Sequence, residues 1–311
     1  MRSEVETLWA FHGRRLRAAT PPEHLMDRVA FSEHPPFRVV ACKHCGFVYR
    51  NPIEREYELA DIYAGEAPAP EVLQALHDTQ QRSYRAQAAR VLREVGRDGA
   101  GLEVGSYVGA FLAAAREVGL YFEGVDINPD ANRFTRSLGF AVHDGALEDL
   151  ETDRRFDVVA IWNTFDQLPH PRAVANAAWK LLRPGGLLAI RVPNGAFYES
   201  LRAMLQEAPD HRGLTPALRR VAACLALAHN NLLTFPYRFG FTARSITLLL
   251  ADIGFSVRHI EGDVLVPIAD EWTKTWATLE ERAVKAVLTK LARRNTAWAP
   301  WLEVYARKER S

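Results

Sequence analysis

The sequence has little of several features that mark special classes of protein. It holds three cysteines among 311 residues, too few for a disulfide framework, which fits a reducing compartment. No apolar run approaches the roughly 20 residues that span a bilayer, and the charged start, Met1 to Glu6, lacks a signal-peptide core. The 39 Lys and Arg nearly balance the 38 Asp and Glu. We therefore expect a cytoplasmic protein with neither nucleic acid nor membrane as partner.

Composition is otherwise that of a globular protein, with 48% apolar and 25% charged residues. Basic residues gather in two places, at residues 14–17 and 293–310. Each cluster could be a binding patch, but a solvated face is the favoured interpretation.

A glycine turn follows the first strongly apolar segment of the chain. Residues 102–112 read as a buried strand, a turn at Gly105 and the start of a helix, with Gly109 allowing that helix to pack close to the strand. Free N–H groups at the start of such a helix suit a nucleotide-like ligand. The pattern is weak alone, because glycine turns between strands and helices are common.

An acidic residue at the end of the next strand strengthens the nucleotide interpretation. The strand at 121–125 ends at Asp126, 21 residues after Gly105. An acid at this point of a βαβ unit can accept both ribose hydroxyls of an adenosine. Asn128 and Pro129 then predict the N-cap and first position of a helix. Asp126 could instead be a solvated acid at the end of a strand. Because the glycine loop precedes it, the ligand-binding interpretation is favoured.

Strands and helices alternate along the chain, which predicts an α/β fold with a doubly wound parallel sheet. A helix at Pro70–Val95, ended by Gly96, precedes the first sheet strand. We expect a fifth strand at 187–192 and then an insertion of about 195–240 with two short helices, at 201–205 and 218–227. We expect this insertion to be a helical cap over a ligand site, and a packed surface excursion is the alternative. The remaining predicted elements are a helix at 243–253 begun by Thr242, a strand at 255–260, a helix at 271–293 and a strand at 298–306.

Two later motifs carry a resemblance to a known family. The strand Phe156-Asp157-Val158-Val159 and the turn Arg183-Pro184-Gly185-Gly186 follow the glycine loop in this order. From about Tyr84 to the C-terminus the chain closely resembles the class I S-adenosylmethionine-dependent methyltransferases. The resemblance implies a Rossmann-like, seven-stranded methyltransferase sheet with a final antiparallel strand. It also implies S-adenosylmethionine as cofactor. The near-neutral charge and the expected cap favour a small-molecule acceptor over nucleic acid, with O-, N- and C-methylation all open.

The resemblance also assigns roles to individual residues. Glu103 and the glycine loop would surround the methionine part of the cofactor, and Asp126 would hold the ribose. Ile127 would pack on the adenine, and Asp144 and Ala146 would meet its edge. The floor of the pocket near the sulfonium would be residues 163–165. The residues expected to bind cofactor are Glu103, Gly105, Ser106, Tyr107, Gly109, Asp126, Ile127, Asp144, Gly145, Ala146, Asn163, Thr164 and Phe165. Many relatives have glycine in place of Tyr107 and histidine in place of Gln167.

Methyl transfer from a sulfonium is an in-line displacement, so the enzyme chiefly positions the nucleophile and excludes water. A base is needed only when the nucleophile carries a proton that it cannot lose beforehand. Candidate catalytic residues are His170, His229 and Tyr237, with Asp166 as a further one. The two histidines have plainer alternatives, a helix cap for His170 and a surface position for His229.

The first 65 residues differ in character from the rest, and we expect them to form a small N-terminal module. Residues 66–311 are expected to form the methyltransferase domain. Two short strands flank Cys42-Lys43-His44-Cys45-Gly46, and a C-x-x-C turn is half of a zinc knuckle. This segment resembles the zinc-binding module of sugar C-methyltransferases, in which a second C-x-x-C-G precedes it. Here Trp9 and His12 stand at that place. A metal-free remnant is favoured over a site built from His12, Cys42, Cys45 and a further group such as His24 or His34.

Two other functions stay open. A nicotinamide-dependent oxidoreductase would use Asp126 equally well, but would leave the Arg-Pro-Gly-Gly turn unexplained. A non-catalytic protein of the methyltransferase fold would explain Tyr107, Gln167 and the broken cysteine pattern. The sequence gives no oligomeric state.

Overall fold

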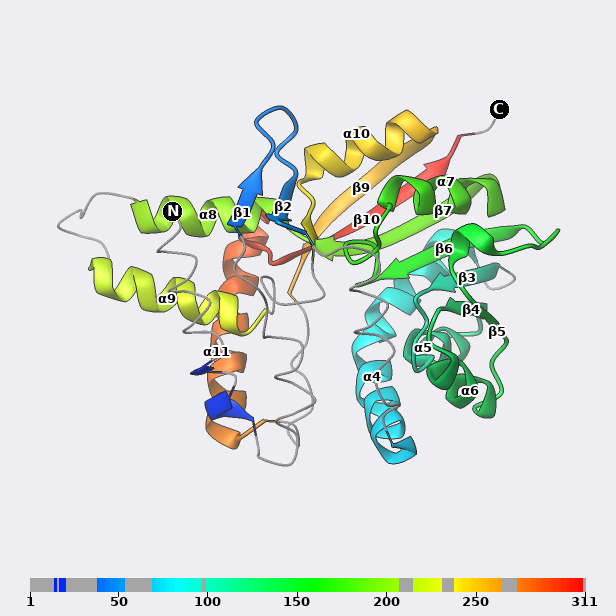
Figure 1. The fold of residues 1–311 in the computed structure, drawn as a ribbon, viewed down its shortest axis with the longest axis horizontal. Coiled ribbons are helices and arrows are strands. Elements are labelled where there is room, and N and C mark those ends of the chain that lie inside the picture. Colours follow the sequence, from blue (N-terminus) through cyan, green and yellow to red (C-terminus); the bar gives the residue numbers. More distant parts are fainter. Residues whose placement is uncertain are drawn as a thin grey trace. The chain divides into compact units, whose positions relative to one another are not determined.

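The computed structural model describes residues 14–15, 17–20, 38–53, 69–96, 99–206, 215–230, 238–264 and 273–309 (Figure 1). These residues divide into two compact units. The sheet unit comprises the described residues of Glu54–Val192, Ile246–Ile260 and Glu303–Ser311. The insertion unit comprises those of Met1–Ile53, Pro193–Ser245 and Glu261–Leu302.

A seven-stranded sheet has the order β5-β4-β3-β6-β7-β10-β9. The strands β3, β4, β5, β6 and β7 pair in parallel where they are neighbours. The last strand, β10, lies between β7 and β9 and completes the sheet as its antiparallel member. The predicted Rossmann-like methyltransferase sheet is therefore confirmed. The strand bounds are β3 Ala100–Val104, β4 Tyr121–Asp126, β5 Val142–Asp144, β6 Phe156–Trp162, β7 Leu182–Pro193, β9 Phe255–Asp263 and β10 Trp301–Lys308.

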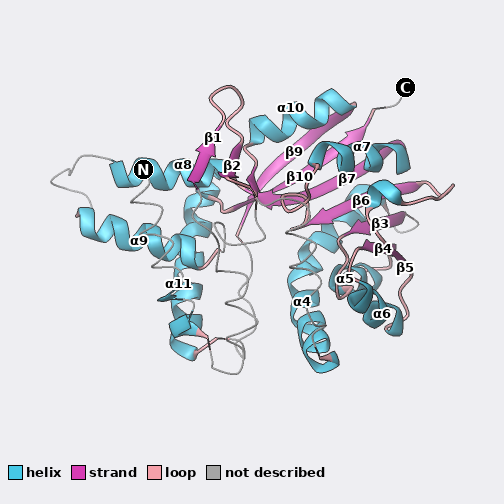
Figure 2. Ribbon diagram, in the orientation of Figure 1, coloured by secondary structure: helices cyan, strands magenta, loops and turns pink. Residues whose placement is uncertain are grey.

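Helices cover both faces of this sheet (Figures 1 and 2). One face carries α4 (Pro70–Val95), α5 (Ala110–Glu117) and α6 (Pro129–Ser137), and the other carries α7 (Pro171–Leu181) and α10 (Ala243–Ile253). The side chains of β6 are almost wholly buried, as a strand covered on two faces requires. Phe111 of α5 lies at the centre of the core, with ring contacts to Tyr84, Phe122 and Trp162.

Helix ends follow the predicted capping chemistry. The Asn128 side chain accepts hydrogen bonds from the N–H groups of Asp130 and Ala131, with Pro129 at the first position of α6. The predicted bounds of α4 match, and Gly96 ends it with φ of 78°. Thr242 Oγ1 accepts from the Ser245 N–H at the start of α10.

Several element boundaries differ from prediction. β7 begins at Leu182, so the Arg-Pro-Gly-Gly segment is part of a strand rather than a turn before it. Phe156 pairs with Leu182 but Val158 pairs with Leu187, and this register shift accommodates the extra residues. β10 begins at Trp301, because residues 296–298 form a 3₁₀ turn. α11 is Thr275–Arg294, and the insertion helices are longer than expected, α8 at Gly195–Gln206 and α9 at Pro216–Ala228.

The insertion unit joins distant parts of the sequence. β1 (Arg38–Ala41) and β2 (Val48–Asn51) form the predicted hairpin around the C-x-x-C turn. β2 also pairs with β8 (Phe239–Gly240), so the hairpin shares a sheet with the end of the insertion. Helices α8, α9 and α11 pack around a second apolar cluster that includes Leu288 and Trp301.

The predicted domain boundaries, 1–65 and 66–311 with an insertion at about 195–240, stay predictions. Among the described residues, no helix combines the length and apolarity that crossing a membrane requires.

Candidate functional site

The predicted glycine loop joins β3 to α5 at the carboxyl end of the parallel strands. Gly105 has φ of 73°, and its N–H donates to the Val125 carbonyl over 2.8 Å. A Cβ atom at this position would lie 2.4 Å from Thr164 Oγ1. Gly109 is the N-cap of α5 with φ of 67°, and its Cβ would lie 2.6 Å from Thr135 Cγ2. Both glycines are therefore needed for the close approach of the loop to β6 and α6.

Tyr107 adopts the backbone conformation that a glycine would take. Its φ is 43°, a left-handed value that costs a non-glycine residue about 1 kcal/mol or more. Two hydrogen bonds hold it there, from its N–H to Asp126 Oδ2 over 2.8 Å and from Thr135 Oγ1 to its carbonyl over 2.7 Å. The loop of this chain is thus fixed by side chains of β4 and α6.

Two carboxyl groups meet at the start of the loop. Asp126 accepts backbone N–H groups from Tyr107 and from Asn128, the latter over 2.9 Å. Burial raises the pKa of Asp126 although these N–H groups oppose the rise. Burial, and then the charge of Asp126, raise the pKa of Glu103 well above its usual range.

Two buried polar atoms at this loop could hydrogen-bond to a ligand. Glu103 Oε2 and Ser106 Oγ are buried and have no hydrogen-bond partner among the described residues. Buried polar groups are satisfied in nearly all native structures, and the exceptions call for a ligand or water. The residues expected to surround the methionine part of the cofactor therefore fit a polar ligand.

The residues expected at the adenine lie on the neighbouring strands. Ile127 follows β4 and is 59% exposed, so its apolar side chain is accessible for packing against the adenine ring. Asp144 ends β5, where Arg136 and Asn132 hydrogen-bond to its carboxylate and lower its pKa. Gly145 has φ of 112°, and its N–H donates to the Asp126 carbonyl, so the β5 loop is fastened beside Asp126. Ala146 follows in this loop.

The predicted pocket floor follows β6. Asn163 has φ of 56°, Thr164 Oγ1 donates to the Trp162 carbonyl over 3.1 Å, and Phe165 is fully buried. The Gln167 side chain donates a hydrogen bond to the Asn163 carbonyl. The side chain therefore braces the loop.

Asp166 places a carboxyl group in the interior beside this loop. It is fully buried, and neither carboxylate oxygen has a hydrogen-bond partner among the described residues. Burial raises its pKa well above the usual range. A carboxyl group in such a place destabilises the fold whenever it is ionised.

The substitution Asp166→Asn is expected to stabilise the protein at pH 8 and to change little at pH 4. The pKa of Asp166 is higher in the folded state than in the unfolded state, so the carboxyl group ionises first in the unfolded chain. The folded state therefore loses stability as pH rises above about 3.9, the pKa of an aspartate in the unfolded chain. Asparagine cannot ionise, so the gain at pH 8 is about 1–3 kcal/mol. Urea unfolding at both pH values measures it, with Asp153→Asn, an exposed acid before β6, as control. A loss of stability at pH 8 contradicts the assignment.

The three candidate catalytic residues lie in different surroundings, and all stay predictions. His170 is exposed and occupies the N-cap position of α7, where its carbonyl accepts from the Ala173 N–H, without a capping bond from its side chain. His229 belongs to the insertion unit, where its Nε2 lies 2.7 Å from Glu280 Oε1 of α11. Tyr237 lies outside the described residues.

Comparison with known proteins decides the family. The model of the methyltransferase domain matches residues 76–260, which contain the glycine loop, Asp126 and β6. The chain belongs to this methyltransferase family. The methyltransferase is accordingly an enzyme of class EC 2.1.1.-, with S-adenosylmethionine as cofactor, and the nicotinamide-dependent alternative is set aside.

Solved structures share the fold of the methyltransferase at low sequence identity. One chain of the complex between the Trm112 methyltransferase activator and a methyltransferase candidate from Haloferax volcanii is 16% identical, with a TM-score of 0.51 over 78% of this chain and 95% of that chain. The 1,6-didemethyltoxoflavin N1-methyltransferase of Burkholderia thailandensis is also 16% identical, with a TM-score of 0.49 over 88% and 99%. No curated protein matches the sequence.

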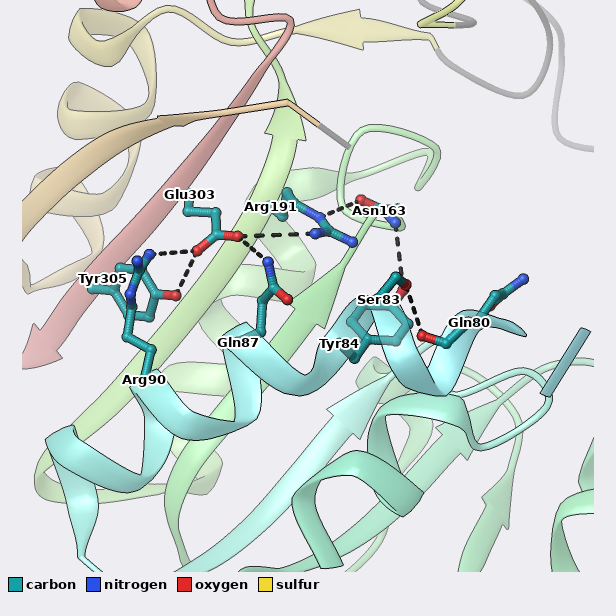
Figure 3. A network of polar contacts seen from close by, with 9 residues as sticks. All are labelled: Gln80, Ser83, Tyr84, Gln87, Arg90, Asn163, Arg191, Glu303 and Tyr305. Atoms are coloured by element: carbon teal, nitrogen blue, oxygen red, sulfur yellow. Dashed lines mark hydrogen bonds and ion pairs between the residues drawn. The ribbon is translucent and has the colours of Figure 1, made fainter. Parts of the chain in front are cut away.

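Sequence reasoning missed a buried polar network that includes Asn163 of the methyltransferase (Figure 3). Arg191 of β7 donates from Nε to Asn163 Oδ1 over 2.8 Å and lies near Glu303 of β10. Both are buried charged residues inside otherwise apolar strands. That burial pattern is the one sequence feature that could have drawn attention to them.

Proposed function

We propose that this enzyme transfers a methyl group from S-adenosylmethionine to a small molecule at the carboxyl edge of β3, β4 and β6. The observation that supports this site above all is a pair of buried polar atoms, Glu103 Oε2 and Ser106 Oγ, which have no partner among the described residues. They belong to a loop in which Gly105 and Gly109 leave no room for a Cβ atom. These atoms offer an acceptor and a hydroxyl to the polar groups of the cofactor's amino acid part. Asp126 keeps lone pairs free for two ribose hydroxyls after accepting its two backbone N–H groups.

The chain's own residues then act by positioning. The bound cofactor supplies an activated methyl group. Asn163 and Phe165 form the floor of the pocket beside the methyl group that is transferred. Phe165 is buried and apolar, so it helps to exclude water from that floor. The in-line geometry requires the acceptor atom to be held about 3 Å from the methyl carbon.

Charge supports a small acceptor over nucleic acid. The net charge is +1, and several residues of the two basic clusters have partners inside the protein. Arg15 pairs with Glu280 and Arg307 with Glu94. Lys308 donates to the carbonyls of Trp179 and Leu182. Phosphate binding needs free cationic groups, so these residues are poorly suited to it.

Radiolabelled S-adenosylmethionine tests the proposal directly. The enzyme is incubated with a fractionated cell extract, and the labelled methyl group is followed into the low-mass, protein and RNA fractions. Label in the low-mass fraction that depends on the enzyme supports the proposal. Label confined to RNA or protein overturns the acceptor class, and failure of the enzyme to bind S-adenosylhomocysteine overturns the cofactor site.

We also propose that the C-x-x-C turn is a knuckle remnant that retains no zinc. The half-site itself persists. Hydrogen bonds from the backbone N–H groups of Cys45 and His44 lower the pKa of Cys42, and Gly46 closes the turn with φ of 75°. Within the described residues, no group of three metal-ligating side chains gathers. His12, His24 and His34 lie outside the described residues. Two thiolates alone hold zinc poorly, since structural sites are four-coordinate.

Elemental analysis after dialysis is expected to find well below one zinc per chain. The reason is that Trp9 and His12 stand where the related zinc-binding modules have two further cysteines. Without those two thiolates the affinity for zinc is sharply lower. The double variant Cys42→Ser/Cys45→Ser supplies the background value. One zinc per chain in the parent protein, lost in the double variant, would overturn the remnant interpretation.

A further inference from the structure

A buried carboxylate on β10 is the centre of the polar network in the sheet unit. Glu303 is 2% exposed. It accepts hydrogen bonds from Gln87, from Arg90 Nη1 over 2.8 Å and from the Tyr305 hydroxyl over 2.7 Å. Burial by itself would raise the pKa of Glu303, but Arg191 and these donors hold it below its usual value. Glu303 is therefore ionised and fixed by residues of α4 and β10.

Arg191 continues the network toward the predicted cofactor floor. Its Nη1 lies 3.9 Å from Glu303 Oε1, and its Nε donates to Asn163 Oδ1 over 2.8 Å. The guanidinium carbon lies 5.2 Å from the centre of the Tyr84 ring. Arg191 is 3% exposed, so its charge is held among Glu303, Asn163 and the Tyr84 ring, as Figure 3 shows.

The contact with Arg191 decides which way the Asn163 amide faces. A carboxamide can exchange its oxygen and nitrogen by a half turn, and only its partners choose between the two orientations. A guanidinium donates and cannot accept, so Oδ1 must face Arg191. The Asn163 Nδ2 is then directed to the Tyr84 hydroxyl, 3.4 Å away. The left-handed backbone of Asn163 places this oriented amide at the end of β6.

We propose that Arg191, anchored by Glu303, is a positioning residue that fixes the Asn163 side chain and thereby sets the affinity of the cofactor site. The inference rests on the proposed site at Asn163. Glu303 then acts through Arg191 and never touches the ligand. Arginine is suited to this role, because its planar fork can bond two partners in fixed directions.

Coupling between Glu303 and Asn163 separates positioning from a general structural role. The dissociation constant of S-adenosylhomocysteine is measured by calorimetry for Glu303→Gln, Asn163→Ala and the double variant. Each single change is expected to weaken binding about tenfold, and the double variant is expected to be no weaker than Asn163→Ala alone. Independent effects would multiply to about 100-fold. Losses that multiply overturn the inference.

A matched control removes another ion pair between the same two elements. Glu94 of α4 pairs with Arg307 of β10 over 2.8 Å, and the pair is partly buried. Glu94→Gln therefore disturbs the packing of α4 on β10 without touching Glu303, Arg191 or Asn163. Its dissociation constant is expected to stay within twofold of the parent value. A tenfold loss in this control would attribute the Glu303 effect to packing and overturn the inference.

A measurement without ligand separates failure of this inference from failure of the proposed function. The Arg191 Nε–H resonance of ¹⁵N-arginine-labelled protein is assigned by its loss in Arg191→Met. It is expected to shift in both Glu303→Gln and Asn163→Ala and to stay in place in Glu94→Gln. An unchanged resonance in Glu303→Gln overturns the anchoring of Arg191 whether or not the protein binds ligand. Shifts without any binding by the parent protein overturn the cofactor site, and with it the effect on affinity.

Discussion

Replacing Asp126 with alanine is expected to weaken binding of S-adenosylhomocysteine by about 100-fold or more. A hydrogen bond to a charged group contributes about 1.5–3 kcal/mol, and the ribose of the ligand would offer two hydroxyls. The loss of both bonds corresponds to at least two powers of ten in affinity. The change also removes the acceptor for the Tyr107 N–H, which frees a loop held in a left-handed conformation. Calorimetric titration of the parent protein and the variant measures the ratio.

Two further variants locate the origin of that loss. Asp126→Asn keeps one acceptor oxygen and the shape of the side chain, so its affinity is expected between those of the parent and Asp126→Ala. Asp130→Asn removes an acid four residues further along, in the first turn of α6, where it pairs with Arg133. It is expected to bind as the parent does. Equal affinities for Asp126→Ala and the parent would contradict the placement of the ribose.

Local features of the chain were predictable from sequence because their causes are local. Asn128 begins α6 by accepting hydrogen bonds from N–H groups within three residues, and Pro129 fits the first helical position. Gly96 ends α4 by its own conformational freedom. The order of strands followed from alternation and from the family resemblance. The Arg183–Gly186 segment was placed wrongly, because its incorporation into β7 depends on the register with β6, which a single segment does not encode.

The candidate site was predictable in part for the same reason. Gly105, Gly109 and Asp126 occupy positions whose backbone chemistry is visible in the sequence. The conformation of Tyr107 was not, because it depends on a hydrogen bond that its N–H donates to Asp126 and on one that its carbonyl accepts from Thr135. The bond between Gln87 and Glu303 spans 216 positions of the chain, and no periodic pattern announces such a pair. Long-range polar contacts therefore form the part of the site that only the structure supplies.

Replacing Phe111 with alanine is expected to cost about 3–5 kcal/mol in the free energy of unfolding. The ring is 1% exposed and lies 5.0 Å from Phe122 and 5.3 Å from Trp162, centre to centre. Strands β4 and β6 lie on one side of the Phe111 ring and α4 lies on the other. The cavity left by removal of the ring therefore cannot collapse without a shift of the sheet. Phe111 follows the glycine loop by two residues. Equilibrium unfolding in urea, followed by tryptophan fluorescence, measures the cost.

An exposed aromatic residue on the same sheet separates cavity formation from loss of an aromatic ring. Tyr121 begins β4 and is 57% exposed, so Tyr121→Ala is expected to stay within about 0.5 kcal/mol of the parent. Because a ligand that binds only the folded state adds stability by mass action, saturating S-adenosylhomocysteine should raise the stability of Phe111→Ala as much as that of the parent. A smaller rise would show that the core beneath α5 also shapes the loop, and a cost below 1 kcal/mol would contradict the central place of Phe111 in the core.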